Sequence, residues 1–89
     1  AEAGDASALE AQVQANPGDH QARFDLAVAL AGSGAREKAV EHLLAIMAAD
    51  RDWNDAAART KLVSFFDVWG PKDPATIMGR RKMSSLLFS

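Results

Sequence analysis

The chain has 89 residues, a net charge of −2 and no cysteine, and 48% of its residues are hydrophobic. A chain of this length forms one small domain, and the absence of cysteine excludes disulfide bonds, thiolate metal sites and thiol redox chemistry within it. No apolar run is long enough to span a bilayer, and the small net charge does not indicate a nucleic-acid or membrane partner. The charge is uneven, however: residues 71–89 carry four basic side chains and one acidic one, whereas residues 1–70 carry six basic and eleven acidic ones.

Two helices are predicted in the first third of the chain. Ser7 and Glu10 have the spacing of a capping box, which predicts that a first helix begins at Ser7 and ends before a turn at Asn16-Pro17-Gly18. Asp19 is a suitable N-cap for a second helix. We expect this helix to end at Gly32-Ser33-Gly34, because glycine adopts the left-handed conformation at low cost.

Three more helices follow, each marked by start and stop signals. A third helix is expected from Arg36 to Ala49, and Asp52 or Asn54 can cap a fourth that ends at Gly70-Pro71. Asp73-Pro74 combines a cap with a proline in the first helical position, which predicts a fifth helix to about Phe88. Apolar residues recur every three or four positions and no stretch alternates like a strand, so the predicted fold class is all-α.

Residues 20–53 resemble one complete tetratricopeptide repeat, a helix–turn–helix unit with small and large side chains at set positions. Ala27 and Ala39 are the small residues that let the two helices approach. Larger apolar residues flank them in the expected places: Leu26, Leu30, Leu43 and Ile46. Arg23 and Arg51 depart from the pattern, since the family prefers tryptophan and proline there.

Half repeats are expected on either side, at about residues 6–17 and 54–69. The predicted architecture is therefore tetratricopeptide-like, with about five helices in antiparallel hairpins and a C-terminal capping helix at about residues 74–88. Since about three repeats are normally needed for stability, we expect either the C-terminal helix to cap the array or the chain to form a homo-oligomer.

A narrower resemblance covers most of the chain. Ala-Asp-Arg-Asp-Trp-Asn-Asp (49–55), Ala-Arg-Thr-Lys-Leu-Val-Ser-Phe-Phe (58–66) and Arg-Arg-Lys-Met-Ser-Ser-Leu-Leu-Phe (80–88) follow the repeat in order. This arrangement resembles the C-terminal region of the chaperedoxins, in which a thioredoxin-like domain precedes tetratricopeptide-like helices. The resemblance implies a cytoplasmic co-chaperone that holds unfolded or partly folded clients and passes them to a chaperonin or another chaperone. It also implies that the sequence is a fragment of a longer protein with an N-terminal thioredoxin-like domain.

Two groups of residues are candidates for binding protein partners. Tetratricopeptide proteins commonly bind ligands on the surface lined by their first helices, which by spacing includes Phe24 and Val28. These side chains suit apolar contacts that tolerate many sequences, although another helix or the thioredoxin-like domain is an equally good candidate to cover them. The second group lies at the basic and apolar C-terminal end and resembles a docking peptide: Arg80, Arg81, Leu86, Leu87 and Phe88. The alternatives are a solvated basic face and apolar side chains that fold back onto the preceding helix.

No catalytic, metal or cofactor site is predicted. His20 and His42 lie far apart, lack the spacing of a metal site and are expected at the surface. The preferred function is a module of a thioredoxin-like co-chaperone that binds unfolded clients, a partner chaperone or both. One alternative is a structural appendage that orients or dimerises the thioredoxin-like domain, and another is the substrate-selecting part of a disulfide oxidoreductase.

Overall fold

The computed structural model describes the backbone of residues 2–88 and the side chains of residues 6–88. The regular secondary structure of the described backbone is entirely helical, which confirms the predicted all-α fold. Its elements are five helices: α1 (Glu2–Ala15), α2 (His20–Gly32), α3 (Arg36–Ala49), α4 (Ala57–Trp69) and α5 (Pro74–Phe88).

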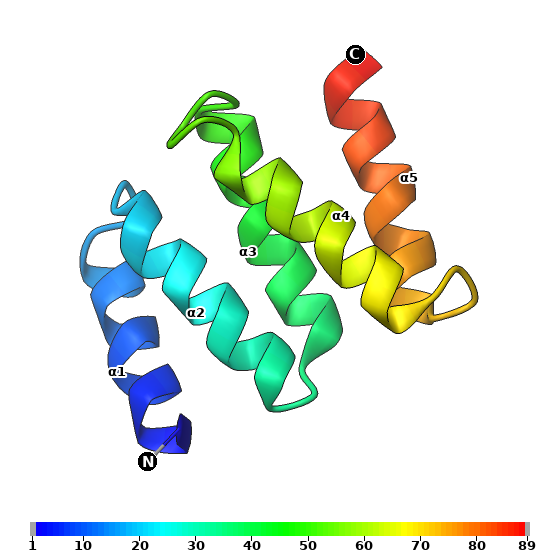
Figure 1. Cartoon of the computed structure of the whole chain (residues 1–89). Coiled ribbons are helices and arrows are strands. Elements are labelled where there is room, and N and C mark those ends of the chain that lie inside the picture. Colours follow the sequence, from blue (N-terminus) through cyan, green and yellow to red (C-terminus); the bar gives the residue numbers. More distant parts are fainter. Residues whose placement is uncertain (1, 89) are drawn as a thin grey trace.

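The helices form successive antiparallel hairpins with α3 at the centre (Figure 1). The most extensive contact is between α2 and α3, and α3 also packs on α4 and α5. On the far side, α1 packs on α2. In Figure 1, α2 and α4 lie in front of α3 and run in the same direction, as expected of first helices in consecutive repeats. The fold is therefore a short array in which each helix contacts its neighbours in the chain.

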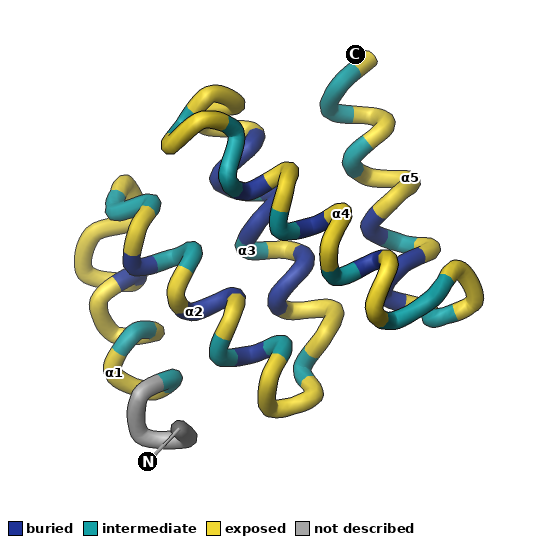
Figure 2. Tube along the Cα trace, viewed as in Figure 1, coloured by how far each residue is buried: buried dark blue, intermediate teal, exposed yellow. Residues whose placement is uncertain are grey.

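The core is built around α3, which has more buried residues than any other helix (Figure 2). Its buried side chains are Ala39, Val40, Leu43, Leu44, Ile46 and Met47. Ala27 on α2 and Ala39 on α3 have 0% relative exposure, in line with their predicted place at the close approach of these helices. Leu26, Leu62 and Phe66 complete the centre of the core from α2 and α4.

Gly79 allows α5 to pack closely against the two preceding helices. A Cβ atom at this position would lie 2.6 Å from Cζ of Phe66 on α4 and 3.0 Å from Cγ1 of Val40 on α3. Both of these side chains are buried, so they have little space in which to move away. Only glycine fits this contact without a shift of the surrounding core.

Three of the predicted helix ends are confirmed in detail. The Asp19 side chain accepts a hydrogen bond from the backbone N–H of Ala22 at 3.1 Å, and Asp73 accepts one from Ala75 at 2.8 Å. After α2, Gly34 takes the left-handed conformation with a φ of 94°. Local sequence signals therefore define the start of α2, the turn to α3 and the start of α5.

The predicted start of the first helix is wrong. Helix α1 begins at Glu2, so Ser7 lies within the helix and does not act as its N-cap. The segment before Ser7 contains Ala3 and Ala6, which favour helix, and acidic residues, which are favourable near a helix N-terminus. These preferences extend the helix beyond the capping box.

The predicted caps of the fourth helix are also wrong. Asn54, Asp55 and Ala56 all have left-handed backbones, with φ of 50°, 56° and 62°, and α4 begins only at Ala57 without a side-chain cap. Asp50 organises the turn instead, because its side chain accepts a hydrogen bond from the N–H of Asp52 at 3.2 Å. Asn and Asp tolerate this conformation better than most residues, but at Ala56 it costs roughly 1–2 kcal/mol.

Candidate protein-binding surface

The surface between α2 and α4 carries the predicted residues Phe24 and Val28. Phe24 is half-buried, and its ring lies 5.7 Å from that of Trp53 in the turn between α3 and α4. Val28, one helical turn further along α2, is 40% exposed. The turn before α4 therefore partly covers Phe24, whereas Val28 remains open to a partner.

A stack of two aromatic rings lies on α4, the first helix of the following half repeat. The rings of Phe65 and Trp69 are 4.9 Å apart and nearly parallel, as expected for residues four positions apart on one helix. Both side chains are half-buried against the edge of the core. We refer to Phe24, Val28, Trp53, Phe65 and Trp69 together as the inner surface; it is predominantly aromatic and only partly shielded from water.

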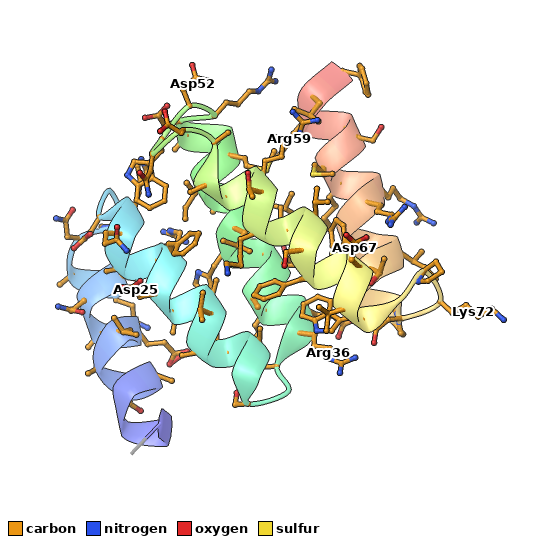
Figure 3. The ribbon with its side chains drawn as sticks, viewed as in Figure 1. Asp25, Arg36, Asp52, Arg59, Asp67 and Lys72 are labelled. Atoms are coloured by element: carbon orange, nitrogen blue, oxygen red, sulfur yellow. The ribbon has the colours of Figure 1, made fainter. Side chains whose placement is uncertain are left out.

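Two cations flank the aromatic stack. Lys61 lies 5.8 Å from the centre of the Phe65 ring, and Arg36 lies 5.3 Å from the Trp69 ring. Arg36, labelled in Figure 3, also forms a 2.5 Å ion pair with Asp73 at the start of α5. This pair fixes the guanidinium over Trp69, while Lys61 has no ion-pair partner among the described residues. Of these two cations, Lys61 is therefore the one whose charge is not compensated at the rim of the inner surface.

Phe65 and Trp69 were not among the residues predicted from the sequence for this surface. Their spacing of four was a usable signal, because it places both rings on one side of α4. The partner cation from α3 was not predictable, since Arg36 lies far from Trp69 in the sequence and is brought there only by the packing of α3 on α4.

Neither histidine is an exposed surface residue, contrary to expectation. His20 packs edge-on to Trp53, with ring centres 6.0 Å apart, and its Nδ1 atom is buried without a hydrogen-bond partner among the described residues. His42 is half-buried, and its Nδ1 lies 3.2 Å from the Arg23 guanidinium of α2. Burial lowers the pKa of His42 below 6.5, and the positive charge of Arg23 lowers it further. The interaction with Arg23 also gives a structural role to the arginine that departs from the repeat pattern.

The structure separates the basic residues of the C-terminal helix. Arg80 lies over the ring of Phe66, 5.7 Å from its centre, and Lys82 forms a 3.1 Å ion pair with Glu41 on α3. Arg81 is exposed and forms no ion pair within the described part of the chain. These three cations therefore do not form one continuous basic patch.

The apolar C-terminal residues also differ from one another. Leu86 and Leu87 are half-buried and pack against the core. The Arg51 guanidinium donates a hydrogen bond to the backbone carbonyl of Leu86, which attaches the end of α5 to the turn after α3. Phe88 is 85% exposed and is the member of this group that is open to a partner.

The described residues contain neither a metal-binding group of side chains nor a membrane-spanning helix. No group of three or more histidine, aspartate or glutamate side chains among them is arranged to hold a metal ion. None of the described helices combines the length and apolar character needed to cross a membrane.

Comparison with known proteins supports the architecture. A family model described as tetratricopeptide repeat matches residues 1–88. The chain therefore belongs to the tetratricopeptide repeat family, whose members are protein–protein interaction modules. No curated protein and no solved structure gives a significant match to the chain.

Proposed function

We propose that the chain is the protein-binding module of a thioredoxin-like co-chaperone and that unfolded or partly folded clients bind to its inner surface. The observation that carries this proposal is a pair of aromatic contacts on the first helices of the two units: Phe24 of α2 with Trp53, and Phe65 with Trp69 on α4. Membership of an interaction-module family supports it, and so does the resemblance to the chaperedoxins in residues 49–66 and 80–88.

The chemistry of the inner surface suits an extended client segment. Aromatic side chains offer large apolar areas, and their ring faces accept aliphatic and aromatic partners alike. Few polar groups are available to read a particular sequence, so binding should depend on apolar content. Lys61 adds attraction for acidic groups at the rim without being required for the apolar contacts.

The aggregation of a heat-denatured test protein provides the experiment. At stoichiometric ratios and without nucleotide, the chain should slow the rise in light scattering. Val28→Ser should weaken this protection. Val63→Ser is a matched control, because Val63 lies on α4 outside the inner surface and is 43% exposed compared with 40% for Val28. Far-UV circular dichroism should show the same helicity for both variants.

Equal protection by the two variants would show that clients do not use the inner surface. If the wild-type chain itself gives no protection, the client-binding proposal fails, and the module is better described as an appendage that orients or dimerises a thioredoxin-like domain. Phe24→Ser is a less specific test, since it also removes a contact with Trp53 that holds the turn before α4.

A further inference from the structure

A second surface lies between α4 and α5, on the opposite side of α4 from the inner surface. In Figure 1 these helices are closest at their connecting turn and diverge toward the start of α4 and the end of α5. Helix α5 contacts α3 more extensively than it contacts α4. The diverging parts of α4 and α5 therefore form an edge of the helical array, which we call the open edge.

Contacts and helical spacing identify the side chains on the open edge. Arg80 lies over the Phe66 ring of α4, so the side of α5 that carries Arg80 faces α4. Met83 and Leu87 follow Arg80 by three and seven positions and therefore lie on the same side of α5. On α4, Val63 lies three positions before Phe66, and Arg59 lies four positions before Val63. Residues three or four positions apart share one side of a helix, so Val63 and Arg59 also point toward α5. Figure 3 shows Arg59 on this side of α4.

The open edge has apolar side chains that are accessible to solvent. Val63 is 43% exposed, and Met83 and Leu87 are half-buried. A shallow hollow of about 320 Å³ on α4 is lined by Ala56, Arg59, Thr60 and Val63. Helix α3 packs on α2, α4 and α5, whereas α4 and α5 contact each other less, so their diverging parts leave room for another helix.

The charges at the open edge favour an acidic occupant. Arg59 and Arg80 are exposed and form no ion pair among the described residues, and Arg80 lies at the boundary with α4. Arg81 lies about 100° further around α5 and points away from this edge. Asp67 is the acidic residue that projects from α4 on this side in Figure 3. A symmetric dimer through two copies of α5 would bring together helices that contain three basic residues and no acidic one, so their charges would repel.

We propose that the open edge binds an amphipathic helix of a partner protein, with its apolar side on Val63, Met83 and Leu87 and its acidic residues against Arg59 and Arg80. Helix-in-groove binding places most of the affinity in a few apolar contacts, while the flanking charges set the orientation and the salt dependence. The binding surface is separate from the inner surface, so either proposal can fail without the other.

Two synthetic peptides test the proposal, and their affinities are measured by fluorescence anisotropy. Both peptides carry leucine at alternating spacings of three and four. One has glutamate on the flanking positions, and the other has lysine there. The glutamate peptide should bind the chain at least about tenfold more tightly at low salt, and the difference should shrink as salt is added. Equal affinity of the two peptides, or no binding by either, would overturn the proposal.

Two variants locate the binding site. Val63→Ser and Arg59→Glu should each weaken binding of the glutamate peptide by about fivefold to tenfold, since one removes an apolar contact and the other reverses a charge. The matched controls Val28→Ser and Lys72→Glu should leave the affinity within about twofold. Loss of affinity in the controls equal to that in the edge variants would place the peptide elsewhere and overturn the proposal.

Sedimentation velocity distinguishes a partner from a second copy of the chain. The wild-type chain should remain a monomer at concentrations where the glutamate peptide binds. A dimer that Val63→Ser dissociates would show that a second copy occupies the open edge, and the proposal of an acidic partner helix would then be wrong.

Discussion

Gly79 offers a sharp test of how the last helix is held in place. Replacing it with alanine adds one methyl group at a position where the ideal Cβ would lie 2.6 Å from the Phe66 ring and 3.0 Å from Val40. Gly32 is the matched control, because it is also helical but has no atom within 4 Å of an added Cβ. The two substitutions are chemically identical and differ only in their surroundings.

The expected changes in the free energy of unfolding have opposite signs. In a helix, alanine is favoured over glycine by roughly 0.5–1 kcal/mol, so Gly32→Ala should stabilise the fold by up to this amount. At Gly79 the same gain is opposed by overpacking, which costs about 1–3 kcal/mol when buried neighbours must shift. Phe66 is 2% exposed and Val40 0% exposed, so neither can relax into solvent. Gly79→Ala should therefore be the less stable variant by about 1–3 kcal/mol.

Thermal unfolding followed by far-UV circular dichroism measures this difference. For a domain of this size, 1 kcal/mol shifts the melting temperature by roughly 4–8 °C, so the two variants should melt at least about 5 °C apart. If Gly79→Ala melts at or above the temperature of Gly32→Ala, α5 does not approach Phe66 as closely as described. The placement of the open edge, which depends on the same contact, would then also be wrong.

Thr76, which is buried, and His42, which is half-buried, give two further predictions. Thr76 is 0% exposed, and its Oγ1 has no hydrogen-bond partner within the described residues. Thr76→Val should therefore stabilise the fold by about 1–2 kcal/mol, measured by urea unfolding. A loss of stability would mean that the hydroxyl has a partner such as a bound water. The pKa of His42 is lowered by burial and by Arg23, so as the pH falls below about 7 the unfolded chain binds more protons than the folded one and the stability of the fold decreases. This decrease in melting temperature should be smaller in His42→Gln, and an identical pH dependence in both proteins would contradict a lowered pKa.

The sequence predicted most of the fold because its signals are local. Asp19 and Asp73 accept hydrogen bonds from backbone N–H groups two or three residues away, and Gly34 needs only its own backbone freedom. Each of these features depends on residues close together in the chain. The bounds of α2, α3 and α5 were accordingly predicted closely, and so was the burial of Ala39.

The errors occurred where local preferences compete or where tertiary contacts decide. Around Ser7, a capping box competes with an alanine-rich segment, and the continued helix is the more stable outcome. In the turn before α4, Asn54 and Asp55 were suitable caps, but both adopt left-handed backbones instead. This turn places Trp53 against Phe24 and His20, residues that the sequence does not connect to it. The packing of Trp53 offsets the free-energy cost of the left-handed backbone at residues 54–56, and no local sequence signal predicts this conformation.

The C-terminal helix shows why a charge pattern in a sequence does not define a binding surface. Arg80, Arg81 and Lys82 are consecutive, but successive helical residues point about 100° apart, so each meets a different environment. Arg80 lies over Phe66, Lys82 pairs with Glu41, and only Arg81 remains free of an ion pair or ring contact among the described residues. Of these three residues, Arg80 is the one that faces α4, and the neighbouring cation there is Arg59, which the sequence separates from Arg80 by more than twenty positions. A partner attracted to this end of the molecule therefore meets charges from two helices with apolar side chains between them, which is a surface for another helix rather than for a flexible acidic tail.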